Sequence, residues 1–451
     1  MNPNTVDLRR RSLLAGTAAA PLLGLGLASC GLDGGGDGPG EVGEPDLKAE
    51  LPRAEPGTAE GTGRIVVPFT ARMLGAIGRD DVNAVCSPLS AQVALTMAGL
   101  GAAGDTRAQM ELVLGGTMDE LAAASNTLSS VLAAVGDEER EADERGEGED
   151  APEPAVASLV NGVWTQEGIT VQEAYLEDLA EHFGSGVYEV DYTDDGARED
   201  ARERINGWVA DATNDLIEEL ISADFLSADT RMVLVNALHL KAAWHQPLSS
   251  APGPFTLADG SEVETEMLTG TAQGWYEDDV CRATCLGTYG GDLSLALVQP
   301  VADVPAVLDA WADAVADGAE GAGGGLSAVL DGVQNSDPVE LILPAFDIEW
   351  GGSLREVLEG LGMELAFGAA DFSGITAQES LILSDVVQKA VITVDSEGME
   401  AAAATAAGFA ASAPAEPNEL VLDSPFLFVA YETSTLAPLV LGWIGDPSQT
   451  R

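Results

Sequence analysis

Apolar residues recur at every third or fourth position in two stretches of the chain, a period that predicts helices. The first stretch is 64–78, with apolar positions at Ile65, Phe69, Met73 and Ile77. The second is 197–220, with apolar positions at Ile205, Val209, Leu216 and Leu220. Residues 230–244 instead alternate between apolar and other positions, which predicts a core strand. The chain therefore combines amphipathic helices with buried strands.

Shorter strand patterns follow one another along the rest of the chain, separated by turn residues. Strand character is present at 157–168, 292–300, 339–350 and 425–447. Residues 255–268 predict two strands joined by a tight turn at Asp259-Gly260. Between 301 and 332 the pattern is helical with a glycine-rich interruption. This mixture predicts an α+β fold.

The stretch 394–419 follows neither pattern. It leaves a strand at 389–394, passes through Gly398 and continues as alanines with one threonine. Alanine favours helix, but no apolar stripe is present to dock such a helix. With period two, one face carries Met399, Ala401, Ala403, Thr405 and Ala407. Side chains this small could slip between two existing strands; the alternative is a low-complexity alanine linker.

Two segments are too polar to contribute to a core. Residues 31–63 are rich in Gly, Pro and acidic side chains, which predicts a disordered tether. Residues 136–154 are dense in charge, which predicts a solvated and disordered insertion. The folded domain is therefore expected at 64–451.

The chain of 451 residues is 46% hydrophobic, enough for a large core. Its 75 acidic residues against 20 Lys and Arg give a formal charge of −55. Such a surface repels nucleic acid and anionic lipid headgroups, so neither is expected as a partner. The charge fits solubility or a salty habitat, or else an acidic recognition face.

The first 30 residues predict a targeting segment. Three tandem arginines, Arg9 to Arg11, precede an uncharged stretch that ends at Cys30, a pattern typical of twin-arginine export. Residues 27–30 resemble a lipobox, in which the thiol of Cys30 receives diacylglycerol. A transmembrane anchor is the alternative, although the stretch is short and contains Pro21. We expect an exported protein held by lipid on the outer face of the membrane, or shed from it.

Apart from Cys30, three cysteines remain, and three cannot all pair within one chain. On a strand, Cys281 and Cys285 would lie roughly 13 Å apart, too far for a disulfide. Cys86 has an apolar context and is expected in the core. We expect no structural disulfide.

The sequence contains few residues in patterns typical of a catalytic site. Its histidines are His182, His239 and His245, and the alternation around His239 favours a wall position over a general base. No nucleophile elbow, zinc motif or phosphate-binding loop is present. We expect no catalytic activity, no cofactor and no metal.

Several motifs, taken together, resemble the serpin family from 64 to 447. Asn83, Ser87, Pro88 and Ser90 match its N-x-x-x-S-P-x-S pattern, with Thr106 before the next helix. Its long strand is matched at Thr230, Leu234, Asn236, Lys241 and Trp244. Its L-G-M-x-x-x-F and D-F-S patterns are matched at Leu361, Gly362, Met363, Phe367, Asp371, Phe372 and Ser373. The resemblance implies three β-sheets, about eight to nine helices and an exposed reactive-centre loop.

The resemblance also assigns site residues. Hinge and loop span 395–419, and the hinge is Glu397, Gly398, Met399, Glu400, Ala401, Ala402, Ala403, Ala404 and Thr405. The scissile bond lies within 410–415, with Ala411, Ser412, Ala413 and Pro414 as candidates. The sheet-opening region comprises Asn83, Ser87, Ser90, Asn236, Trp244 and Gln388. Met399 replaces a small polar or β-branched residue, and Gln388 replaces a histidine that bonds the asparagine matched by Asn236.

The resemblance implies a monomeric serine protease inhibitor that acts as a suicide substrate. No Lys or Arg occurs in 410–415, so small side chains favour elastase-like or subtilisin-like proteases, and Phe409 leaves a chymotrypsin-like target as a lesser alternative. The negative charge disfavours the heparin-like activators that some members use. A non-inhibitory serpin acting as a surface binding protein is the alternative, and a solute-binding lipoprotein fits the leader but none of the motifs.

Overall fold

A computed structural model describes residues 43–451 apart from 78–81, 137–151, 214, 216, 224, 317–324, 379 and 400–416. The described part combines helices and strands, which confirms the predicted α+β class. Within these ranges no helix combines the length and the apolar character needed to cross a bilayer.

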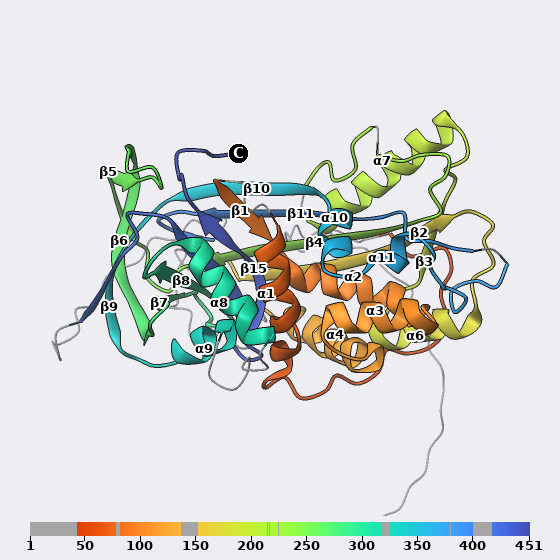
Figure 1. The fold of residues 1–451 in the computed structure, drawn as a ribbon, viewed down its shortest axis with the longest axis horizontal. Coiled ribbons are helices and arrows are strands. Elements are labelled where there is room, and N and C mark those ends of the chain that lie inside the picture. Colours follow the sequence, from red (N-terminus) through yellow and green to blue (C-terminus); the bar gives the residue numbers. More distant parts are fainter. Residues whose placement is uncertain are drawn as a thin grey trace, which may run out of the picture. The chain divides into compact units, whose positions relative to one another are not determined.

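Six strands form the sheet that positions the site, here called the main sheet (Figure 1). Its order is β10 (Phe346–Ser353), β11 (Asp385–Val394), β12 (Gly398–Met399), β4 (Met232–Ala243), β2 (Val156–Gln166) and β3 (Val187–Val190). β4 and β2 are antiparallel over ten register pairs, so these two strands form a continuous ladder.

The other strands form one nine-stranded sheet. Its order is β1 (Asn83–Cys86), β15 (Ala437–Ile444), β14 (Phe426–Glu432), β8 (Leu293–Pro300), β7 (Cys281–Gly287), β6 (Glu262–Glu277), β9 (Pro338–Pro344) and β13 (Asn418–Val421), with β5 (Ser249–Thr256) paired to β6. Two hydrogen-bonded sheets are therefore present in the described residues, where the sequence predicted three. The reason is β6, which runs without a break for 16 residues and pairs with β5, β9 and β7 in turn.

Ten α-helices lie in the described residues, slightly more than the eight or nine expected. They are α1 (Val67–Ala76), α2 (Pro88–Leu100), α3 (Gly104–Leu114), α4 (Met118–Leu132), α6 (Glu173–Phe183), α7 (Asp195–Ala212), α8 (Val304–Ala316), α9 (Gly325–Gly332), α10 (Arg355–Gly360) and α11 (Glu364–Phe367), after a 3₁₀ turn at Thr62–Ile65. The segment around Gly362 forms two short helices, because this glycine has a φ of 106°.

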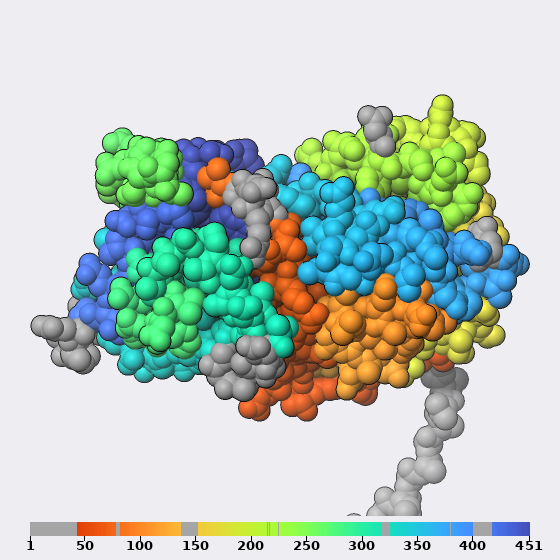
Figure 2. Space-filling model, in the orientation of Figure 1, coloured from red at the N-terminus to blue at the C-terminus, as the bar shows by residue number. Residues whose placement is uncertain are grey.

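Helices cover both faces of the main sheet. α2 contacts β2, β4 and β15, and almost all its residues are buried, which explains why it is apolar all round. α7 lies across the opposite face, where Ile205, Trp208 and Val209 pack with Val233 and Val235 of β4. Figure 2 shows α7 as a yellow-green ridge at the upper right. Because successive side chains of β4 point to opposite faces of the sheet, this strand contributes to two separate cores, one beneath α2 and one beneath α7.

Part of the predicted tether packs on the domain instead. Residues 31–42 lie outside the described residues, but from Gly43 onward the chain makes specific contacts. Leu47 forms an antiparallel bridge with Val187 of β3, and Gly63 is buried. Composition suggested disorder because the segment has few apolar residues, whereas its contacts are mostly backbone hydrogen bonds and ion pairs. Most of the predicted 136–154 insertion also lies outside the described residues.

Candidate functional site

The main sheet is only partly closed between β11 and β4. These parallel strands pair over five positions, from Asp385 with Val233 to Lys389 with Ala237. Beyond them, residues 390–393 and 238–241 do not pair with each other; their partners lie in β10 and β2, on the outer sides. The direct pairing of the two central strands therefore ends inside the sheet rather than at its rim.

Two residues of the predicted hinge, Gly398 and Met399, already occupy the top of this opening. Gly398 pairs with Ala243, and Met399 pairs with Ala242 on β4 and with Val394 on β11. Met399 is 1% exposed, so its thioether is buried in the core. A Cβ at position 398 would lie 2.4 Å from the carbonyl oxygen of Ala242, so this close approach requires glycine. The loop thus starts as a strand.

A tight turn holds the base of the loop. The Asp395 carboxylate accepts hydrogen bonds from the backbone N–H groups of Glu397 at 2.7 Å and Gly398 at 3.0 Å. Trp244 donates its backbone N–H to the Glu397 carbonyl at 2.8 Å and its indole N–H to the Asp395 carbonyl at 2.9 Å. Trp244 is 1% exposed, so these bonds are shielded from water.

Trp244→Phe is expected to weaken this turn while keeping an aromatic ring in the core. It removes the donor to the Asp395 carbonyl, and the unfolding free energy should fall by about 1–3 kcal/mol in urea titration. Trp275→Phe is the matched control, because Trp275 is only partly buried and lies on β6. Equal losses in the two variants would contradict a specific role for the Trp244 indole.

Three amide side chains form a row across the centre of the main sheet, where β4 and β11 still pair. Asn161, Asn236 and Gln388 are in register on β2, β4 and β11. Gln388 donates from Nε2 to the Ser87 carbonyl at 2.7 Å and accepts the Ser87 N–H at 3.0 Å. Its contact with Asn236 Oδ1 is longer, at 3.5 Å. Gln388 is therefore hydrogen-bonded mainly to the backbone of Ser87, the residue that caps the start of α2.

Two polar atoms in this row of amides have no hydrogen-bond partner among the described residues. Asn236 is fully buried, and its Nδ2 has no hydrogen-bond partner among the described residues. The same holds for Oδ1 of Asn161. Buried polar groups without partners cost free energy, so these two atoms lower the stability of the closed centre of the sheet.

The structure brings most of the predicted sheet-opening residues to this region, but not all. Ser87 donates its hydroxyl to the Leu439 carbonyl at 2.7 Å and caps α2 together with Ser90. Asn83 lies apart: its Nδ2 donates to the Asp446 carbonyl at 2.8 Å, and its Oδ1 accepts the Gly445 N–H at 2.9 Å. Asn83 therefore fixes the C-terminal turn rather than the separating strands.

Two residues of the site were not predicted. Asp395 could have been recognised, since an aspartate directly after a strand commonly accepts N–H bonds two and three residues on. Asn161 could not, because its place beside Asn236 depends on strand register.

The rest of the predicted loop falls outside the described residues. This applies to the hinge from Glu400 to Thr405, to the scissile-bond candidates 411–414 and to Cys30. The last described residue before this gap, Met399, lies in the main sheet, and the next described strand, β13, pairs in parallel with β9 of the other sheet. The loop therefore connects two different sheets.

Within the described residues, the cysteines and histidines take part in no group of three or more potential metal ligands. Cys86, Cys281 and Cys285 are free thiols, and Cys86 is fully buried, as expected. Burial raises the pKa of Cys281 to about 12, so this thiol is neutral at physiological pH. His182 is on α6 and His239 is a buried residue of β4, as its strand pattern suggested.

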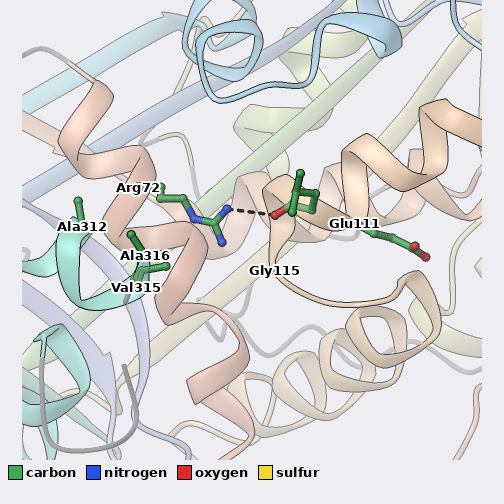
Figure 3. Close-up of a pocket in the computed structure, with 7 residues that line it drawn as sticks. Arg72, Glu111, Gly115, Ala312, Val315 and Ala316 are labelled. Carbon is green, nitrogen blue, oxygen red and sulfur yellow. Dashed lines mark hydrogen bonds between the residues drawn. The ribbon is translucent and has the colours of Figure 1, made fainter. Parts of the chain in front are cut away.

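A pocket of about 520 Å³ lies between α1, α3 and α8 (Figure 3). Arg72 points into it and donates from Nη1 to the Leu112 carbonyl at 3.0 Å and from Nε to the Pro68 carbonyl at 3.1 Å. Burial lowers the pKa of Arg72. None of the residues that line this pocket belongs to the main sheet. Through its hydrogen bond to the Leu112 carbonyl, Arg72 caps the C-terminal end of α3.

Comparison with known proteins assigns this arrangement to a family. The family model described as serpin, serine protease inhibitor, matches residues 66–447. An uncharacterized serpin-like protein of Thermococcus kodakarensis is 30% identical over 387 residues, 84% of each chain. The leukocyte elastase inhibitor of Bos taurus is 29% identical over 81% of this chain and 93% of its own.

Solved structures agree on the fold. The thermophilic serpin tengpin in its native state matches with a TM-score of 0.73 at 23% identity, covering 89% of this chain and 97% of its own. The native stressed conformation of an Arabidopsis serpin gives 0.68 at 22% identity, covering 86% and 97%. The family match, the half-open main sheet and the loop that joins two sheets lead to one conclusion: this chain belongs to the serpin family.

Proposed function

We propose that this protein inhibits serine proteases as a suicide substrate. The supporting observation is the opening between β4 and β11, whose top is already filled by Gly398 and Met399. A loop that begins as a strand inside the sheet can continue as one without a change of direction. Members of this family are typically protease inhibitors, and the proposal concerns how this one acts.

The mechanism starts with ordinary proteolysis. The protease serine attacks the scissile carbonyl, the C–N bond breaks, and the amine leaves with the C-terminal part of the chain. The N-terminal part stays bound to the protease as an ester. Freed at one end, the loop inserts below Met399 and carries the protease with it. Insertion places a new strand between β4 and β11, which adds ladder hydrogen bonds to the main sheet.

The register of the hinge defines where the inserted residues lie. If β12 continues antiparallel to β4 from the pair Met399–Ala242, Ala403 comes opposite Leu238, and Thr405 comes opposite Asn236. The strand would separate Asn236 from Gln388, and the Thr405 hydroxyl would be able to accept a hydrogen bond from Asn236 Nδ2. Insertion thus gives a partner to a donor that has none in the described residues.

The target is proposed from the loop sequence. Residues 410–415 are Ala, Ala, Ser, Ala, Pro and Ala, so a protease with a shallow specificity pocket fits, as in elastase-like or subtilisin-like enzymes. The leukocyte elastase inhibitor among the relatives supports an elastase-like target. We propose that the protein acts on the outer face of the cell membrane with Cys30 carrying the lipid, a location that the lipobox-like residues 27–30 support.

One observation favours a second candidate, a surface binding protein that does not trap proteases. Met399 is 1% exposed and the turn before it is well bonded, so the hinge is held firmly before any cleavage. A loop held this way could be cut and released before it inserts.

The proposal is tested by mixing the purified protein with elastase or subtilisin and separating the products on a denaturing gel. We expect a band heavier than either partner that survives boiling, together with a released C-terminal peptide whose first residue defines the scissile bond. Trypsin is the control and should give no such band, because 410–415 contains no cation. Cleavage without any stable complex would support the second candidate.

A further inference from the structure

The pocket between α1, α3 and α8 combines apolar walls with a cation (Figure 3). Its volume of about 520 Å³ lies within the range of roughly 300–1,000 Å³ that is typical of small-molecule sites. Leu112 is 74% exposed, so its apolar surface faces solvent at this pocket rather than a neighbouring element. The apolar part of the lining is Leu112, Gly115, Ala312, Val315 and Ala316.

The cation is the guanidinium of Arg72, which keeps part of its hydrogen-bonding capacity. A guanidinium carries five N–H donors. Arg72 uses Nε for the Pro68 carbonyl and one N–H of Nη1 for the Leu112 carbonyl. Among the described residues, neither the second N–H of Nη1 nor Nη2 has a partner. Both partners of Arg72 are neutral carbonyls, so no carboxylate balances its charge.

The backbone of Gly115 leaves room beside the unused nitrogen. This glycine ends α3 with a φ of 85°, the left-handed conformation common at helix ends. A Cβ at this position would lie 3.4 Å from Arg72 Nη2 and 3.4 Å from Pro68 Cβ. Because residue 115 has no side chain, a ligand atom can approach Nη2 from the pocket.

Arg72 also differs from most arginines of this acidic chain. The other charged lining residue, Glu111, is already bound: its Oε1 accepts the Arg107 Nε–H at 3.0 Å and the Met118 N–H at 2.9 Å. Figure 3 shows Glu111 pointing away from Arg72. Burial lowers the pKa of Arg72, since its guanidinium is partly shielded from water. The described arginines that do pair with a carboxylate are Arg64, Arg107, Arg198, Arg202, Arg204, Arg282, Arg355 and Arg451.

We propose that this pocket binds a small carboxylate with a short alkyl chain, such as a medium-chain fatty acid. The carboxylate would accept the unused N–H groups of Nη1 and Nη2, whose planar fork matches its two oxygens. The alkyl chain would lie along Leu112, Ala312 and Val315 and cover apolar surface that now faces water. The site contains no residue of the main sheet or the loop, so the inference does not depend on the proposed function.

The test is calorimetric titration of the purified protein with sodium octanoate, in about 0.15 M salt to screen the acidic surface. We expect saturable binding at one site, and about tenfold weaker binding of hexanoate, which lacks two methylene groups. Octanol keeps the chain without the charge, and acetate keeps the charge without the chain. Each should bind at least tenfold more weakly than octanoate. Octanol that binds as tightly as octanoate would overturn the proposal, and so would octanoate that does not bind.

One pair of variants tests the cation. Arg72→Gln removes the charge and should weaken octanoate binding about tenfold or more. Arg64→Gln is the control, because Arg64 forms an exposed ion pair with Asp331 and does not line the pocket. Equal octanoate affinity in the two variants would mean that the guanidinium does not recognise the carboxylate, and the proposal would be wrong.

A second pair tests the pocket and keeps the hydrogen bonds of Arg72, so it remains decisive if Arg72→Gln does not fold. Ala312→Phe places a ring in the pocket from α8 and should abolish octanoate binding. Ala306→Phe places the same ring on an exposed position of α8 that does not line the pocket, and binding should persist. Equal affinity in these two variants would show that octanoate binds elsewhere on the protein.

Discussion

Ala403→Arg is expected to abolish protease trapping and to leave a protein that is simply cut. Met399 faces the core, and residue 403 shares its face with period two, so on insertion this side chain comes opposite Leu238, which is 4% exposed. Burying an unpaired guanidinium there costs several kcal/mol. Since about 1.4 kcal/mol corresponds to a factor of ten, a barrier raised by ~3 kcal/mol slows insertion about 100-fold, and hydrolysis of the acyl-enzyme then wins.

The control is Glu400→Arg. Residue 400 comes opposite Lys241, whose side chain is 27% exposed and pairs with Glu153 at the surface. This substitution changes the charge by two units but places the new cation toward water, so trapping should persist within a few-fold. The ratio of complex to cleaved protein on a denaturing gel measures both variants. Trapping by Ala403→Arg at the wild-type level would refute the register extended from Met399.

Cleavage of the loop is expected to raise the melting temperature by on the order of 10 °C or more. In the described structure β4 and β11 pair with each other over five positions only, and Asn236 Nδ2 has no hydrogen-bond partner among the described residues. An inserted strand would form about ten ladder hydrogen bonds at about 1 kcal/mol each. For a domain of this size, that gain corresponds to roughly 10–20 °C.

The measurement is a thermal melt followed by circular dichroism, before and after limited digestion with subtilisin. The Ala403→Arg protein, cut in the same way, serves as the comparison and should show a much smaller rise. If the melting temperature of the cleaved wild type does not change, the loop does not insert. The protein would then be a surface binding protein that does not trap proteases, rather than an inhibitor.

Local pattern predicted the strands and helices of this fold well, because β4 alternates between two buried faces and α7 buries one regular face. It could not predict how sheets join. The long β6 continues through a register shift between Gln273 and Tyr276, and only its three partners show that two expected sheets are one. Strand count is a local property, whereas sheet membership depends on pairing across long sequence separations.

The residues of the site could be predicted from the sequence where they belong to a family motif. Gly398, Met399, Trp244 and Gln388 all lie at the opening, although Gln388 bonds the backbone of Ser87 more closely than Asn236. Position in a motif did not reveal that Asn83 belongs to the C-terminal turn.

The order of residues 43–57 was missed for a related reason. Its composition is that of a disordered linker, and its order comes from backbone bonds and two charged side chains, which leave no hydrophobic signature.

The position of β14 and β15 has a consequence for synthesis. They are the last strands to leave the ribosome, yet they lie between β1 and β8 inside the nine-stranded sheet. Until they arrive, β1 has no neighbour and β8 keeps an open edge, so this sheet stays incomplete until residues 426–444 have been synthesised. A message truncated before Phe426 would yield a polypeptide with exposed strand edges, a natural substrate for chaperones and quality-control proteases.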